Sequence, residues 1–274
     1  MRNGRLENLA LIGLAALALG SSDGCAPAAR PSEAPAVPDR KTWTAPDPAT
    51  IPAGPFGESV RRGLRIFEQT PRYAASYVGN RLSCSDCHIQ GGTAAYASPM
   101  VGLPGLFPMY NQRAKHVISL EERVQECFLR SENGRRLPYD GPEMTALVSY
   151  MQWLSQGQAA GHPFPGRGLV KLPKLEANAG RGSGIFTQQC AGCHGADGAG
   201  KSPILPALWG PDAYNTGAGM NQVAKMAAFV QHNMPQNHPG TLTPQEAYDV
   251  SAYVASKPHS PFQPDAPRVS AGSK

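Results

Sequence analysis

Apolar and polar positions follow a helical pattern in six segments, which cover residues 58–69, 119–132, 142–155, 178–188, 221–232 and 244–256. A helix that buries one face repeats its apolar side chains every three to four residues. No segment shows the strict alternation that half-buried strands require. The pattern predicts an all-α fold. The 27 Pro and 30 Gly among 274 residues predict long loops between the helices.

The segment over residues 119–132 has distinct helix signals at both ends. Ser119 followed by Glu122 predicts a capping box, and Gly134 favours a stop just beyond the last turn. The apolar stripe of this helix is formed by Leu120, Val124 and Phe128. A neighbouring edge carries a guanidinium, a thiol and a hydroxyl, on Arg123, Cys127 and Ser131. Their spacing of four residues places these three groups on one side of the helix.

The two halves of the chain repeat one pattern. In each half a Gly, followed by Ile and Phe three and four residues later, precedes a Cys-x-x-Cys-His sequence. Each half also ends with a similar helix, in which Tyr150 and Tyr253 occupy equivalent positions. The repeat predicts a duplicated module. The expected boundaries are domains at residues 56–156 and 175–258, a linker rich in Gly and Pro at 157–174, and a tail at 259–274.

The first 24 residues have the pattern of an export signal. Arg2 and Arg5 precede an apolar run over residues 9–20, which is too short to cross a membrane. A Pro-rich linker is expected over residues 25–55. Cys25 would attach the chain to a membrane if it were lipidated, although the residues before it lack the aliphatic side chain usual at lipidation sites. We therefore expect a periplasmic protein, attached to a membrane only if Cys25 is lipidated.

The distribution of charged residues argues against nucleic acid as a partner. The formal net charge is +5, but the 25 Lys and Arg residues are scattered along the chain rather than gathered in basic runs. Nucleic-acid-binding surfaces usually concentrate such residues. We expect no nucleic-acid partner.

Four of the six cysteines lie in two Cys-x-x-Cys-His sequences, formed by Cys84, Cys87 and His88 and by Cys190, Cys193 and His194. This sequence is typical of c-type haem attachment, in which both thiols form thioethers and the imidazole binds iron. A thioredoxin-like redox pair would need a βαβ context, and a zinc site would need four grouped ligands. The sequence thus predicts two cytochrome c-like domains in tandem, with two covalently bound haems.

Each haem iron also requires a sixth ligand. In the second domain Met234 is favoured, because Pro235 ends the preceding helix and leaves Met234 in an extended loop. Met220 is the alternative, whereas Met226 is expected to pack inside a helix. In the first domain Cys127 is the candidate, because Arg123 and Arg130 would favour its thiolate. Three alternatives remain: Met100, Met109, or an inert core role for Cys127.

These residues, together with the runs over 80–84 and 105–113, resemble the dihaem thiosulfate dehydrogenases. The first domain of that family is similar to the dihaem subunit of the Sox sulfur-oxidation system. The resemblance covers residues 56–258. It implies haem ligands His88 with Cys127 and His194 with Met234, and a substrate pocket lined by Arg113, Arg123 and Ser131. Some members carry Lys before the distal Met as an alternative ligand, but here that residue is Asn233.

The resemblance also implies a reaction and partners. Two thiosulfate ions would be oxidised to tetrathionate in a reaction that is also reversible. Cys127, Arg113, Arg123 and Ser131 would have catalytic roles. The electrons would pass to a periplasmic acceptor such as a small cytochrome c or an iron–sulfur protein. The rival functions are electron transfer without substrate chemistry, and a Sox-type subunit that acts on sulfur bound to another protein. A dihaem peroxidase is disfavoured, because no cluster of acidic residues accompanies the haem motifs.

Overall fold

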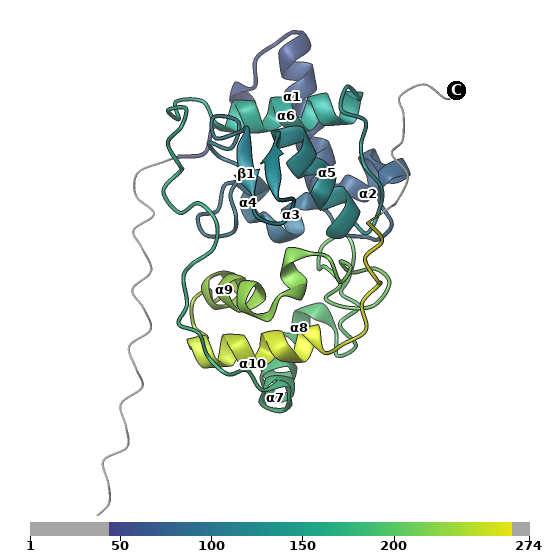
Figure 1. The fold of residues 1–274 in the computed structure, drawn as a ribbon, viewed down its shortest axis with the longest axis vertical. Coiled ribbons are helices and arrows are strands. Elements are labelled where there is room, and N and C mark those ends of the chain that lie inside the picture. Colours follow the sequence, from purple (N-terminus) through teal and green to yellow (C-terminus); the bar gives the residue numbers. More distant parts are fainter. Residues whose placement is uncertain (1–43, 265–274) are drawn as a thin grey trace, which may run out of the picture. The chain divides into compact units, whose positions relative to one another are not determined.

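The computed structural model describes residues 44–264. The expected export signal, Cys25 and the last ten residues of the tail lie outside the described residues. Within that range the fold is helical apart from one short hairpin, which confirms the all-α prediction (Figure 1). No helix among residues 44–264 is both long and apolar enough to cross a membrane.

The first half of the chain contains the helices α1 (Pro55–Glu68), α2 (Thr70–Tyr73), α3 (Cys84–Cys87), α4 (Ile89–Gly92), α5 (Leu120–Arg130) and α6 (Pro142–Leu154). The second contains α7 (Ala179–Gln189), α8 (Ala191–His194), α9 (Val223–Asn233) and α10 (Pro244–Ala255). Three 3₁₀ turns complete the elements of the described range: η1 (Pro48–Thr50), η2 (Ala75–Tyr77) and η3 (Gly219–Asn221). All six predicted helices are present, and their ends differ from the prediction by at most three residues. Pro in the first turn of α1, α6 and α10 explains their sharp starts.

The capping box predicted at the start of α5 is only half formed. The Ser119 side chain accepts a hydrogen bond from the Glu122 backbone N–H at 3.1 Å. The Glu122 carboxylate, however, lies 2.9 Å from His116 Nε2 and does not return to the Ser119 backbone. A competing imidazole from the neighbouring strand takes the acidic partner that the box requires.

The sequence predicted no strands, and this prediction is wrong at one place. Strands β1 (Met109–Asn111) and β2 (His116–Ile118) pair antiparallel, with Tyr110 opposite Val117. Each strand has only three residues, too few for an alternating pattern to be recognised. The hairpin matters for the site, because Arg113 lies in its turn.

The same helix crossing occurs in both halves. Helix α1 packs against α6, and α7 packs against α10 (Figure 1). A Cβ added at Gly63 would lie 2.0 Å from the Ala146 carbonyl oxygen, and one at Gly182 would lie 2.0 Å from the Asp249 carbonyl oxygen. Only Gly permits this closeness. The crossing supports the interpretation of the sequence repeat as a duplicated module.

Each crossing continues into an aromatic contact. The ring of Phe67 lies 5.4 Å from that of Tyr150, and the ring of Phe186 lies 5.4 Å from that of Tyr253. These separations fall in the range favoured by tilted aromatic pairs. The two pairs of rings belong to separate apolar cores, and the second core also includes Leu82 of the first half.

Buried amides join the two halves. The Asn215 side chain donates to the Leu129 carbonyl at 2.8 Å, and its backbone N–H donates to the Arg130 carbonyl at 3.1 Å. From the other side, the Asn80 side chain donates to the Ala213 carbonyl at 3.0 Å. Asn80 and Asn215 are both buried. These bonds hold the end of α5 against the loop that precedes α9.

Candidate functional site

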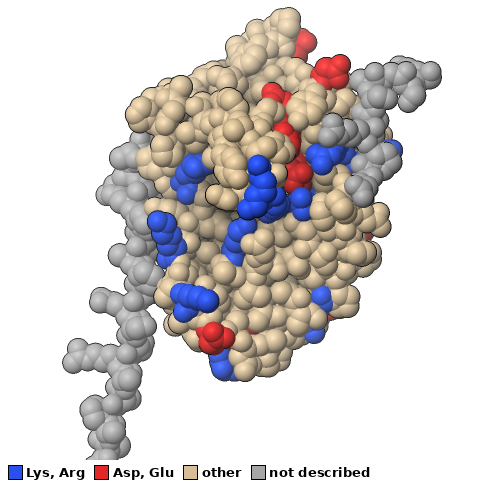
Figure 2. Space-filling view, viewed as in Figure 1, with Lys and Arg blue, Asp and Glu red and all other residues tan. Residues whose placement is uncertain are grey.

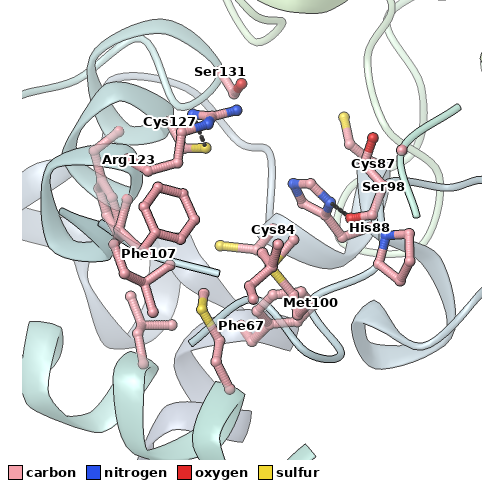
Figure 3. Close-up of a pocket in the computed structure, with 18 of the residues that line it drawn as sticks. Phe67, Cys84, Cys87, His88, Ser98, Met100, Phe107, Arg123, Cys127 and Ser131 are labelled. Atoms are coloured by element: carbon pink, nitrogen blue, oxygen red, sulfur yellow. Dashed lines mark hydrogen bonds between the residues drawn. The ribbon is translucent and has the colours of Figure 1, made fainter. Parts of the chain in front are cut away.

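A cavity of about 440 Å³ lies inside the first half of the molecule. Its walls contain the side chains of the first Cys-x-x-Cys-His sequence, Cys84, Cys87 and His88, together with Cys127 (Figure 3). Apolar groups form much of the remaining wall, among them Phe67, Leu103, Phe107, Leu147 and Met151. The volume falls in the range of cofactor and ligand sites.

The short helix α3 presents the first haem-attachment residues. Ser83 and Asp86 form a complete capping box at its start, which fixes the chain where Cys84 and Cys87 face the cavity. His88 follows the helix, and its Nδ1 lies 2.7 Å from the Ser98 carbonyl oxygen (Figure 3). That contact orients the ring and leaves Nε2 for iron, as second-shell hydrogen bonds commonly do. The cysteines, the oriented imidazole and the apolar cavity fit a covalently bound haem.

The second Cys-x-x-Cys-His sequence is presented in the same way. Cys190 lies between α7 and α8, and His194 ends α8. His194 Nδ1 lies 2.9 Å from the Pro206 carbonyl oxygen, which repeats the contact made by His88. The second set therefore also leaves Nε2 of its histidine for iron.

The candidate sixth ligands of the second haem differ in their surroundings. Met234 follows the last residue of α9 with extended backbone (φ −121°, ψ 150°) and contacts the small cluster around Phe229. Met226 is buried in the core with Phe186, and Met220 is partly buried beside that core. These positions keep Met234 as our candidate and Met220 as its alternative.

Within residues 44–264 no three His, Cys, Asp or Glu side chains gather as metal ligands.

Helix α5 brings three predicted residues to the first cavity. Arg123, Cys127 and Ser131 all line it, and Arg123 Nη1 donates to Cys127 Sγ at 3.1 Å (Figure 3). Burial alone raises the pKa of the Cys127 thiol, but the Arg123 guanidinium and the His88 imidazole lower it by more, to about 6. The site therefore favours a thiolate, the form of cysteine that binds metals. Met100 and Met109 line the same cavity, so the structure brings all three candidate ligands together.

Arg113 is placed differently from the other predicted pocket residues. It is exposed in the turn between β1 and β2 and does not line the cavity. Its Nη1 lies 3.5 Å from the Gly217 carbonyl oxygen in the second half of the chain. Burial, Arg130 and Arg123 lower the pKa of Arg113. The Arg113 guanidinium thus interacts electrostatically with Arg123 of the cavity wall without lining the cavity itself. Strand β1, next to Arg113, contributes Tyr110 and Asn111 to the wall.

Two charged residues of the cavity wall were missed from the sequence. Arg167, in the segment expected to be a linker, lines the cavity and donates to Met109 Sδ at 3.6 Å. Glu132 is only 2% exposed, and burial, Cys127 and Asp86 raise its pKa well above the usual range of a carboxyl. Glu132 directly follows Ser131, but its position at the end of the predicted helix is also typical of a solvated carboxylate. The sequence therefore gives no sign that it is buried. A protonated Glu132 adds no negative charge to the cavity.

The fold and the two attachment sites define a c-type cytochrome with two haem domains. Residues 72–160 match the family model described as SoxA/TsdA, cytochrome c domain, and residues 177–254 match that described as cytochrome c oxidase, cbb3-type, subunit III. The two domains each bind one haem through thioether bonds, as the sequence predicted.

Similar proteins identify the family. The chain is 41% identical to a thiosulfate dehydrogenase of Allochromatium vinosum over 80% of this chain and 85% of that protein. It is 39% identical to a thiosulfate dehydrogenase of Psychrobacter arcticus over 80% of this chain and 69% of that protein. A solved structure of thiosulfate dehydrogenase (TsdBA) from Marichromatium purpuratum superimposes with a TM-score of 0.75 at 38% identity, over 78% of this chain. This chain spans about half of that structure's longer chain. The chain belongs to the thiosulfate dehydrogenase family.

Proposed function

We propose that this protein oxidises two thiosulfate ions to tetrathionate at the cavity of its first domain. The observation that carries the proposal is the Cys127 sulfur, which lines the haem cavity with a guanidinium 3.1 Å away. A protein that only relays electrons needs no cationic group beside a sulfur ligand. Membership of the thiosulfate dehydrogenase family supports thiosulfate as the substrate.

The reaction joins two dianions and releases electrons only. A bond forms between the two sulfane sulfurs, two electrons leave, and no proton is taken up or lost. The two haems, when bound, supply one-electron carriers for those electrons. The residues of the chain must therefore bind and orient anions, and no general base is required.

Cationic side chains offset the repulsion between the substrates. Two dianions 4 Å apart repel by about 4 kcal/mol at the dielectric constant of water, and by more in a cavity. Arg123 faces the cavity beside Cys127, and Arg113 lies close enough to Arg123 to lower its own pKa. Guanidinium groups donate paired hydrogen bonds to oxyanions. We assign sulfonate binding to Arg113 and Arg123, with the Ser131 hydroxyl as a further donor.

The ligand sets favour one direction of electron flow. His88 and Cys127 would hold the first iron, and His194 and Met234 would hold the second. Thiolate donation stabilises ferric iron, whereas a thioether raises the potential. Electrons should pass from the first domain to the second, and then to a small cytochrome c or an iron–sulfur protein. We place this reaction in the periplasm, because haem attachment to Cys-x-x-Cys-His sequences occurs outside the cytoplasm.

The test uses the purified protein with both haems attached. Thiosulfate should reduce ferricyanide in its presence, with tetrathionate as the product. Cys127→Met should abolish turnover while two haems per chain remain. Low-temperature electron paramagnetic resonance of the unsubstituted protein should show one His/thiolate haem.

Met109→Leu is the matched control, because Met109 lines the same cavity as an alternative ligand. It should leave both the His/thiolate signal and turnover in place. Full activity of Cys127→Met, or His/Met spectra at both haems, would overturn the proposal and leave an electron-transfer cytochrome. Activity that requires a co-purifying subunit would instead favour the Sox-type function.

A further inference from the structure

A loop of the second domain gathers cationic side chains from both domains. The Gly217 carbonyl oxygen lies 3.5 Å from Nη1 of Arg113 and 3.5 Å from Nη1 of Arg130, both from the first domain. A Cβ at Gly219 would lie 3.9 Å from Lys225 Cδ, so the Lys225 side chain runs beside the same loop. Figure 2 shows Lys and Arg side chains around a hollow on this face of the molecule.

These cations are only partly neutralised by the protein. Arg130 is paired with the Glu126 carboxylate at 2.6 Å. In the part of the chain that the structure describes, neither Arg113 nor Lys225 has a carboxylate within salt-bridge distance. Burial, Arg113 and Arg123 lower the pKa of Lys225. Charges of one sign that lie this close without a partner raise the energy of the free protein, and a bound anion would relieve that repulsion.

The cations divide between two positions. Arg123 lies inside the cavity and donates to Cys127 Sγ, and the Cys127 charge raises the pKa of Arg123. Arg113 and Lys225 are exposed, and Arg113 lies in the turn next to the cavity-lining residues Tyr110 and Asn111. The reaction requires two dianions at once. Arg123 is placed to serve the one at Cys127, which leaves Arg113 and Lys225 for the other.

We propose that Lys225, together with Arg113, binds the sulfonate group of the second thiosulfate at the mouth of the cavity, between the two cytochrome domains. The same pair binds the outer sulfonate of tetrathionate. This inference rests on the proposed function. It makes the second domain part of the substrate site as well as the carrier of the second haem, and it assigns to the site a ligand class of dianionic sulfur oxyanions.

Lys225→Gln tests the assignment with two measurements. The KM for thiosulfate should rise about tenfold, as expected for the loss of one charge-assisted hydrogen bond, while kcat changes less. Calorimetric titration of the fully oxidised protein with tetrathionate, which cannot turn over without electrons, should show Kd raised by a similar factor. Lys225→Arg should restore most of both values, because it keeps the charge.

Lys201→Gln is the matched control. Lys201 is an exposed lysine of the second domain whose backbone pairs with Leu205. Its substitution removes the same charge and should leave KM and Kd unchanged. An equal effect of Lys201→Gln and Lys225→Gln would indicate general electrostatics and would overturn the assignment.

The outcomes separate the two proposals. An active protein whose KM and Kd are unaffected by Lys225→Gln would refute the role of Lys225 and leave the proposed function intact. Altered spectra of the second haem with unchanged Kd would also refute it, because Lys225 would then act on that haem. A protein with both haems that neither oxidises thiosulfate nor binds tetrathionate would refute the proposed function itself.

Discussion

At the scale of single residues, the chemistry of the site depends on how burial and charge act on one sulfur. Burial raises the pKa of a thiol, because a thiolate is poorly solvated in an apolar cavity. At Cys127, Arg123 Nη1 lies 3.1 Å from Sγ, and its positive charge together with His88 more than offsets the effect of burial. The pKa of Cys127 is lowered to about 6. The same turn of α5 that positions Arg123 therefore favours the thiolate of Cys127, the form of cysteine that binds metals. The i, i+4 spacing made this pair visible in the sequence.

A second buried charge stabilises the other domain. The Asp249 carboxylate accepts hydrogen bonds from the Arg181 guanidinium at 2.6 and 2.8 Å and from the Asn178 backbone N–H at 2.7 Å. Its side chain is 3% exposed. Burial raises the pKa of Asp249, but these bonds, with one from Gln245, lower it below the usual value. The charged form is therefore favoured in the folded protein.

We expect Asp249→Asn to reduce the free energy of unfolding by about 1–2 kcal/mol at pH 7, because charge-assisted bonds to Arg181 become neutral ones. The depressed pKa means that the stabilisation is present above the pKa of the unfolded carboxyl, near 4, and is lost as pH falls through the lower pKa of the folded state. Urea unfolding of both proteins between pH 7 and pH 3 measures the difference. A gap that stays constant down to pH 3 would contradict this account.

At the scale of elements, each domain is organised by one close helix crossing. Gly182 in α7 meets the Asp249 backbone of α10, as Gly63 in α1 meets the Ala146 backbone of α6. This close crossing brings Phe186 and Tyr253 together in the core against which Cys190 also packs. The repeat of Gly, Ile and Phe in the sequence thus reflects how each domain packs: Gly allows the close helix crossing, and Phe contacts the Tyr of the crossing helix.

Gly182→Ala should destabilise the second domain by about 1–3 kcal/mol or more, because its Cβ would lie 2.0 Å from the Asp249 carbonyl oxygen and would force the helices apart. Gly184→Ala is the control in the same helix, since nothing lies within 4 Å of a Cβ there. It should stabilise α7 by up to about 1 kcal/mol through helix propensity. Thermal unfolding followed by circular dichroism compares the two. Equal midpoints for both variants would count against the close crossing.

Regular elements were predictable where the pattern was long enough. Within residues 44–264, all six helices of eleven or more residues follow from their apolar periodicity and end signals. The β1–β2 hairpin could not be recognised, since its strands have three residues each. Its turn holds Arg113, so the exposed position of that residue was equally hidden.

At the scale of the whole molecule, the contact between domains determines which charges surround the proposed substrate site. Asn215 is 2% exposed and bonds to the Leu129 carbonyl and to the Asn133 side chain of the first domain. The side-chain oxygen of Asn215 accepts a hydrogen bond from the Gly217 backbone N–H at 3.0 Å. The loop that receives Arg113 and Arg130 is therefore fixed by the same amide that joins the domains.

Asn215→Ala should lower the free energy of unfolding by about 1–3 kcal/mol, because it leaves the buried Leu129 carbonyl without its side-chain donor. Asn221→Ala removes an exposed bond to the Thr216 carbonyl at 3.2 Å and should change stability by no more than about 0.5 kcal/mol. Urea unfolding followed by haem absorbance tests both. The hypothesis fails if Asn215→Ala is as stable as Asn221→Ala.

The sequence by itself determined the six longer helices of residues 44–264 and the shared edge of Arg123, Cys127 and Ser131, and it predicted the haem-attachment residues and the duplicated module. Each of these depends on spacing along a short stretch of chain, which the covalent geometry of a helix or a thioether-linked haem converts directly into position. Only the tertiary structure decided that Arg167 and Glu132 enter the cavity wall and that Arg113 and Lys225 approach the same loop around Gly217 and Gly219. These residues come from segments far apart in the sequence, and their meeting depends on domain contacts and loop paths that leave no period in the chain.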